Sequence, residues 1–234
     1  MLHKNRVIQL GEDPCRVFQV GGLGIDNILK IQLLDRPALE SALQFSLLRT
    51  NFLITFHPVT LETSTSAQQI DQLLAALLVL KDTGLIFTMP NADTDGRVIY
   101  QKINEFCAAR KNAKAFTTLG QLRYLSCVLH FDGVIGNSSS GLLEVPSFRK
   151  ATINIGDRQK GRLKAESVID CEPYCDAILS AIQTSTSPDF AKRLHNVENP
   201  YGKGGASAAI VDKLESVSLH LIHKKTFYDL PLAK

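Results

Sequence analysis

The sequence has 234 residues, of which 44% are hydrophobic and 21% are charged, and its formal net charge is +3. These values are close to those of ordinary globular domains, so they exclude a disordered chain, and the small, scattered charge excludes a nucleic-acid-binding surface. No apolar run is long enough to cross a bilayer, so we expect no association with a membrane. The length of the chain predicts one large domain with an appendage.

Helical and extended patterns alternate along the chain. The first residues form a basic helical stretch at 2–10 directly after Met1, so we expect no signal peptide. Strands are predicted at 17–20, 52–56, 85–89, 115–119, 133–136, 152–155 and 167–169. Helices are predicted at 37–43, 67–81, 95–110, 121–130, 141–145, 174–183 and 207–221. This alternation indicates an α/β fold with a Rossmann-like, doubly wound parallel sheet.

Two features of the sequence could suggest cofactors, and we expect neither to bind one. The glycine cluster at 21–24 lacks the third glycine of a dinucleotide fingerprint, since Asn27 stands there, and we expect it to allow a close passage of two chain segments instead. Cys171 and Cys175 have Pro173 between them and no histidine nearby, which argues against a metal site. The odd set of five cysteines and the absence of a secretion signal predict reduced thiols and a cytoplasmic protein.

Polar residues follow several of the predicted strands, at the sheet edge where ligands of such folds bind. His57 follows the second strand, and Pro58 forces an extended exit that leaves the imidazole facing this edge. Asn91 and Asp93 follow the third strand, where both residue types also serve as ordinary turn residues. We therefore expect His57 to contact a bound phosphate or sugar.

The segment 132–144, DGVIGNSSSGLLE, carries the strongest signal. It predicts a buried strand ending in Gly136, a hydroxylated turn, and a helix that begins near Ser139. Amides at a helix start are unpaired and carry partial positive charge, and the serine hydroxyls add donors, so the turn suits a phosphate. The alternative is an ordinary strand-turn-helix capped by serine. A serine hydrolase is not indicated, because neither Ser138 nor Ser139 lies between two suitably spaced glycines.

A second loop of the same kind follows the strand at 152–155. That strand ends in Gly156 and brings Asp157 and Arg158 to the same edge of the sheet. The planar guanidinium of Arg158 fits a phosphate better than a lysine would. Two consecutive loops of this type predict a phosphate site between them.

The same residues carry a family resemblance. GNSSSGLLEVPSF and TINIGDRQKGR resemble the signature of the hydrolysing UDP-N-acetylglucosamine 2-epimerases, which convert the nucleotide sugar to free N-acetylmannosamine and UDP. RVIQLGEDPCRVFQVGGLGIDNI, ITFHPVTLE, MPNAD and NPYGKGGAS extend the resemblance over nearly the whole chain. The sequence departs from the family at 148–151, FRKA, where a glycine and then a proline are usual.

The resemblance implies a two-domain GT-B architecture of which this chain resembles the second, nucleotide-binding half. Residues 1–20 then correspond to a remnant of the first domain and the hinge, 21–206 to a UDP-binding Rossmann-like domain, and 207–234 to a C-terminal helix and tail. The family's catalytic carboxylates lie in the other half, so we expect the isolated chain to be inactive. The expected partners are UDP, a UDP-acetamido sugar, and either another copy of the chain or the missing half.

The resemblance also implies roles for individual residues. His57 and Arg158 are the expected catalytic groups, because they stabilise the departing diphosphate. Glu144 grips the ribose hydroxyls, although its position alone also fits a solvated helix residue. Thr118 and Leu119 approach the uracil through free backbone amide and carbonyl groups, and Asn91 and Asp93 line the sugar side. The phosphate turn consists of Asn137, Ser138, Ser139, Ser140 and Gly141.

The expected function is therefore a hydrolysing 2-epimerase acting in sialic or related nonulosonic acid synthesis, with no cofactor. Three alternatives remain open: a non-hydrolysing 2-epimerase, a GT-B glycosyltransferase that needs an acceptor, and a truncated UDP-binding module without turnover. The sequence also leaves the sugar open, because related enzymes act on other acetamido sugars, including a diacetamido sugar.

Overall fold

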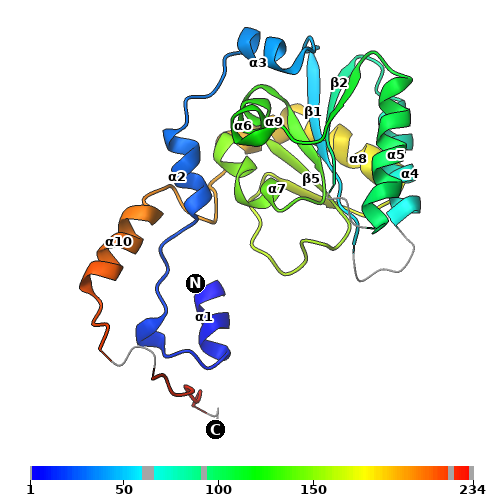
Figure 1. Cartoon of the computed structure of the whole chain (residues 1–234). Helices are drawn as coiled ribbons and strands as arrows, with labels where there is room; N and C mark the ends of the chain where they lie inside the picture. Colours follow the sequence, from blue (N-terminus) through cyan, green and yellow to red (C-terminus); the bar gives the residue numbers. More distant parts are fainter. Residues whose placement is uncertain (1, 60–65, 91–93, 221–223, 232–234) are drawn as a thin grey trace.

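The computed structural model describes residues 2–59, 66–90, 94–220 and 224–231. A six-stranded, wholly parallel sheet forms the middle of three layers, in the order β3-β2-β1-β4-β5-β6 (Figure 1). The strands are β1 Thr50–Thr55, β2 Thr83–Thr88, β3 Ala113–Phe116, β4 Gly133–Gly136, β5 Ala151–Ile155 and β6 Val168–Cys171. The predicted α/β class and six of the seven predicted strands are confirmed.

The strand order creates a switch point between β1 and β4. The chain runs from β1 outward to β3, returns to β4 on the other side of β1, and continues to β6. Thr55 and Gly136 are register partners at the carboxyl ends of the two strands. The connections that leave β1 and β4 lead to opposite faces of the sheet, and α/β folds commonly bind ligands at such a point.

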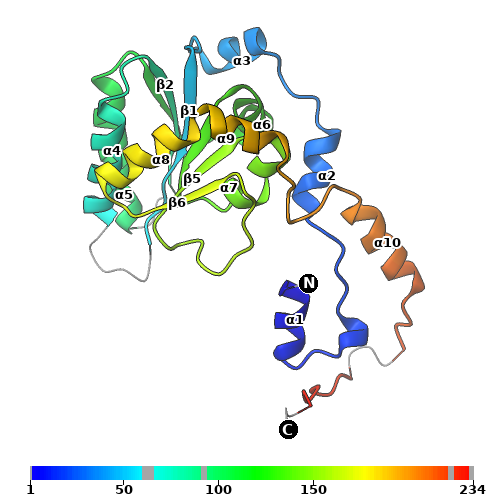
Figure 2. The same cartoon turned by 180° about the vertical axis from the view of Figure 1, so that it is seen from behind.

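Helices cover both faces of the sheet because successive side chains of a strand point to opposite faces and nearly all of those in the inner strands are buried. Ile54 packs with α4, α5 and α8 on one face, and Leu53 packs with α3 and α6 on the other. Figure 2 shows the first of these layers from behind. The helices of the two layers are α4 Ser66–Leu78, α5 Thr94–Ala108, α8 Cys175–Ser185, α9 Pro188–His195, α3 Arg36–Leu43, α6 Gly120–His130, α7 Ser140–Leu143 and the 3₁₀ turn η2 Val145–Phe148.

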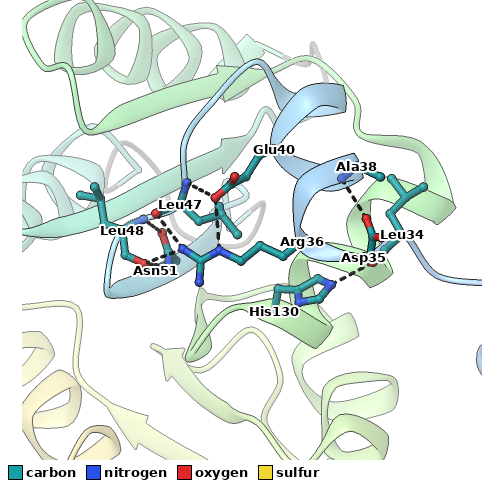
Figure 3. A network of polar contacts seen from close by, with 9 residues as sticks. All are labelled: Leu34, Asp35, Arg36, Ala38, Glu40, Leu47, Leu48, Asn51 and His130. Carbon is teal, nitrogen blue, oxygen red and sulfur yellow. Dashed lines mark hydrogen bonds and ion pairs between the residues drawn. The ribbon is translucent and has the colours of Figure 1, made fainter.

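A polar network fixes α3 and the segment that leads into β1 (Figure 3). Asp35 caps α3 by accepting from the Ala38 amide at 2.9 Å. The Arg36 guanidinium, paired with Glu40, donates to the Leu47 carbonyl at 2.8 Å. These contacts tie α3 to the connection before β1 and so fix the direction in which β1 enters the sheet.

The remaining helices lie to one side of the sheet in both views (Figures 1 and 2). They are α1 Leu2–Gln9, the 3₁₀ turn η1 Pro14–Arg16, α2 Leu23–Lys30 and α10 Ala206–Ser216, which together with the coil between them we call the appendage. The predicted strand at 17–20 is wrong: this segment is coil and belongs to the appendage rather than to the sheet. The expected close passage at the glycine cluster is present, since the Gly22 amide donates to the Tyr201 carbonyl at 2.9 Å. Within the described residues, no helix combines the length and apolar character needed to span a membrane.

A buried carboxylate joins α2 to α10. Asp26, 5% exposed, accepts from the Ser207 amide at 2.6 Å, the Ser207 hydroxyl at 2.5 Å and the Ala206 amide at 3.2 Å. The Ser207 hydroxyl, followed by the Ser207 amide, lowers the Asp26 pKa from 3.8 to about 2. Asp26 therefore acts as an N-cap supplied from a distant segment.

Replacing Asp26 by asparagine should destabilise the protein at pH 7, since a charged acceptor at the start of α10 is lost. The folded-state pKa lies below the ordinary value, so this contribution is complete above about pH 4 and is lost as the pH falls toward 2. We expect urea unfolding, followed by circular dichroism, to show a smaller difference between wild type and Asp26→Asn at pH 3 than at pH 7. The exposed Asp189→Asn change is the control, and a difference that does not depend on pH would contradict this account.

Candidate functional site

The switch-point edge of the sheet is built around Asn137, the first residue after β4. Its side-chain oxygen accepts from the His57 amide at 2.8 Å, and its side-chain nitrogen donates to the His57 carbonyl at 2.8 Å. Its own amide donates to the Thr55 carbonyl at 3.1 Å. Asn137 is 1% exposed, so these bonds are made away from water. They lock the loop after β1 against the loop after β4.

Two glycines allow this close approach. Gly136 has φ 138°, and a Cβ atom added there would lie 1.9 Å from the Thr55 carbonyl oxygen, so a side chain cannot be accommodated. A Cβ atom on Gly141 would lie 2.6 Å from the Thr152 Cγ2 atom, and the Thr152 hydroxyl donates to the Gly141 carbonyl at 2.8 Å. The turn and the start of α7 are therefore pressed against β1 and β5.

The loop after β5 reaches the same point, as the sequence indicates. Arg158 donates to the Asn137 carbonyl at 3.0 Å, and the buried Gln159 donates to the same carbonyl at 2.7 Å. Partial desolvation, and then the charge of Arg162, lower the Arg158 pKa. The Arg158 guanidinium thus lies beside the residue that precedes Ser138, and its positive charge suits an anionic ligand.

The helix after this turn is shorter than the sequence indicates. Helix α7 has four residues, and Glu144 stands between α7 and η2 rather than within a continuous helix. A single turn sums few peptide dipoles, so the macrodipole contributes less than a long helix would. The attraction for an anion must come mainly from the local amides, the hydroxyls and Arg158.

A cavity of about 500 Å³ opens beside the turn. Its lining brings together five of the residues singled out from the sequence: Thr118, Leu119, Ser138, Ser140 and Glu144. One detail of the prediction is wrong, because the carbonyls of Thr118 and Leu119 are not free. The Arg123 side chain donates to the Leu119 carbonyl at 2.8 Å and to the Thr118 carbonyl at 3.3 Å.

Tyr124 also lines this cavity and connects two of the predicted residues. Its hydroxyl donates to the Ser140 hydroxyl oxygen at 2.6 Å, and Ser140 donates to the Glu144 carboxylate at 2.5 Å. Sequence analysis missed Tyr124, Arg123 and Gln159. An aromatic at helical spacing is indistinguishable from a core residue, and the other two residues carry no positional signal of their own.

The remaining expectations are placed as follows. His57 is fixed through its backbone, and its side chain is partly exposed at this edge. Asn91 and Asp93 lie outside the described residues. Across the part of the chain that the structure describes, no group of three potential metal-binding side chains is found.

Replacing Asn137 by alanine removes both side-chain bonds to the partly buried backbone of His57. We expect a loss of about 2–4 kcal/mol in the free energy of unfolding, measured with urea. The exposed Asn196→Ala change is the matched control and should have little effect. A loss below about 0.5 kcal/mol for Asn137→Ala would show that the loops hold without this contact.

The chain is similar to known proteins in sequence and in structure. The family model described as "UDP-N-acetylglucosamine 2-epimerase" matches residues 2–215. The polysialic acid biosynthesis protein P7 of Escherichia coli is 42% identical over 98% of this chain and 59% of its own length. The hydrolysing GDP/UDP-N,N'-diacetylbacillosamine 2-epimerase of Campylobacter jejuni is 39% identical over 98% of this chain and 60% of its own.

Solved structures share the fold at low sequence identity. A putative UDP-N-acetylglucosamine 2-epimerase from Listeria monocytogenes superposes with a TM-score of 0.71 and 14% identity, covering 98% of this chain and 60% of the other. The Methanocaldococcus jannaschii UDP-GlcNAc 2-epimerase in complex with UDP-GlcNAc and UDP gives 0.69 and 16%, covering 92% and 59%. The chain thus spans about three-fifths of the length of these proteins.

Proposed function

This chain belongs to the UDP-N-acetylglucosamine 2-epimerase family, and from that premise we propose that it is the UDP-binding part of a hydrolysing 2-epimerase. The observation that carries the proposal is the convergence of Arg158, Gln159 and the His57 backbone on Asn137, the residue directly before the serine turn. This convergence builds a donor-rich edge at the switch point, where α/β folds bind nucleotides. A relative named as hydrolysing supports this branch of the family.

The diphosphate is proposed to lie against the turn after β4. In the reaction, the proton at carbon 2 of the sugar is removed, UDP leaves, and water adds to give the free 2-epimer. Negative charge develops on the diphosphate as the bond to the sugar breaks. In this proposal, Arg158, His57 and the hydroxyls of Ser138 and Ser139 stabilise that charge. Because Asn137 already fixes the loops, little reorganisation is needed when the charge forms.

The nucleoside is proposed to occupy the cavity of about 500 Å³ beside the turn. Glu144 accepts from the two ribose hydroxyls, and the segment of Thr118 and Leu119 contacts the uracil. Arg123 donates to the carbonyls of both residues, so it restrains the backbone of this segment beside the cavity. The cavity adjoins Ser138, which joins the nucleoside and diphosphate parts of the site.

For the sugar, the proposal names a class of substrates rather than a single compound. The substrate is UDP-N-acetylglucosamine or a related acetamido sugar, and the product is a free 2-epimer of the N-acetylmannosamine type used for sialic or related nonulosonic acids. The base that takes the carbon-2 proton belongs, in this proposal, to the part of the relatives that this chain does not span.

The exposed apolar side chains of Val7, Leu29 and Leu214 in the appendage suit association with that part or with another copy of the chain. We also place the reaction in the cytoplasm, because all five cysteines are free thiols.

The chain should bind UDP much more tightly than uridine, because the donors at the switch point face the diphosphate. Replacing Arg158 by alanine should weaken UDP binding by about 1.5–3 kcal/mol, roughly ten- to hundredfold, when measured by calorimetry. Arg49→Ala is the matched control, since Arg49 is exposed at the opposite edge of the sheet, just before β1. Equal affinities for UDP and uridine would overturn the phosphate assignment.

The 234-residue chain alone should release no free 2-epimer from UDP-N-acetylglucosamine at a rate near that of a complete epimerase. The reason is that the base is proposed to come from the missing part. Proton NMR of the reaction mixture measures the free sugar directly. Robust release by this chain would show that a base exists within it, with Asp93 and Glu144 the first residues to replace.

A further inference from the structure

Three side chains from two helices and the turn that follows form one hydrogen-bonded chain in the nucleoside cavity. Tyr124 comes from α6, Ser140 begins α7, and Glu144 follows α7. The Tyr124 and Ser140 oxygens are 2.6 Å apart, and the Ser140 oxygen lies 2.5 Å from the Glu144 Oε2 atom. All three residues line the same cavity as Leu119.

The direction of this chain is fixed by the chemistry of its members. An ionised carboxylate only accepts, so the Ser140 hydroxyl must give its hydrogen to Glu144. The Ser140 oxygen then accepts from Tyr124. Burial raises the pKa of Tyr124, so the phenol keeps its hydrogen and remains a donor. Removing the Tyr124 hydroxyl would leave Ser140 free to turn away from Glu144.

The contact from Ser140 constrains only one carboxylate oxygen. Oε2 is held, while Oε1 lies on the side of Gly24, where an added Cβ atom would come within 3.8 Å of it. A glutamate side chain otherwise samples several rotamers and loses that freedom when it binds a ligand. A carboxylate that is already held in one rotamer loses less conformational entropy when it accepts hydrogen bonds from two hydroxyl groups.

We propose that Tyr124 is a positioning residue for ribose recognition: acting through Ser140, it holds the Glu144 carboxylate in the orientation that accepts the vicinal hydroxyls of a bound nucleotide. This inference rests on the proposed function, because it assumes that the cavity holds the nucleoside of UDP. Neither the sequence pattern nor the family comparison assigns this role to Tyr124.

The test compares UDP with 2′-deoxy-UDP by calorimetry, using the full chain. Wild-type protein should prefer UDP by about tenfold, and Glu144→Ala should abolish that preference. Tyr124→Phe keeps the ring and removes only the hydroxyl, and it should reduce the preference by about threefold to tenfold while changing affinity for 2′-deoxy-UDP little. Ser140→Ala should reduce the preference for UDP over 2′-deoxy-UDP to the same extent, whatever it does to the affinity for both ligands through the phosphate turn, and it serves as the second variant if Tyr124→Phe does not fold. The exposed Tyr100→Phe is the matched control.

The outcomes separate the two levels of the proposal. Wild-type protein that binds both ligands equally would overturn the ribose assignment of Glu144 and, with it, the role of Tyr124. A wild-type preference that survives intact in Tyr124→Phe or in Ser140→Ala would overturn the role of Tyr124 alone. A purely structural hydroxyl would weaken both ligands equally or lower only the melting temperature, which also contradicts the proposal.

Discussion

The amide side chain of Asn137 is the contact on which the geometry of the switch-point edge depends. The side chain bonds to both the backbone N–H and the backbone C=O of His57. The backbone carbonyl of Asn137 accepts hydrogen bonds from the side chains of Arg158 and Gln159. Loops from three adjacent strands, β1, β4 and β5, therefore meet at one residue. Because Asn137 is buried, each of these bonds would be costly to leave unmade, and the three loops are held as a unit.

This constraint explains why the fold can keep polar groups poised at one edge. Gly136 adopts φ 138°, a conformation open to glycine, so that the backbone can pass directly over β1. The buried side-chain oxygen of Gln159 has no hydrogen-bond partner among the residues that the structure describes, although its side-chain nitrogen donates to the Asn137 carbonyl. Partial desolvation, and then the like charge of Arg162, lower the Arg158 pKa. An anion bound against Arg158 would supply a counter-charge to this guanidinium, which suits the edge to an anionic ligand.

The sequence predicted the structure correctly where a local residue pattern also determines how the segment packs in the fold. The strand at 133–136 and its convergence with the loop carrying Arg158 followed from apolar runs that end in glycine and polar residues. It failed where the signal was ambiguous: residues 17–20 look like a strand, but they form coil outside the sheet. The helices α2 and α9 were also missed, each having only eight residues. Tyr124 could not be found at all, because its role depends on Ser140, sixteen positions away.

The central claim is that UDP binds along the edge that Asn137 organises. Backbone amide NMR of the labelled chain, titrated with UDP, tests it most directly because it locates the ligand without any mutation. The account predicts that the largest shift changes fall in residues 117–119, 136–144 and 156–159, with little change at the amino edge of the sheet. Changes concentrated elsewhere, or none at millimolar UDP, would contradict it.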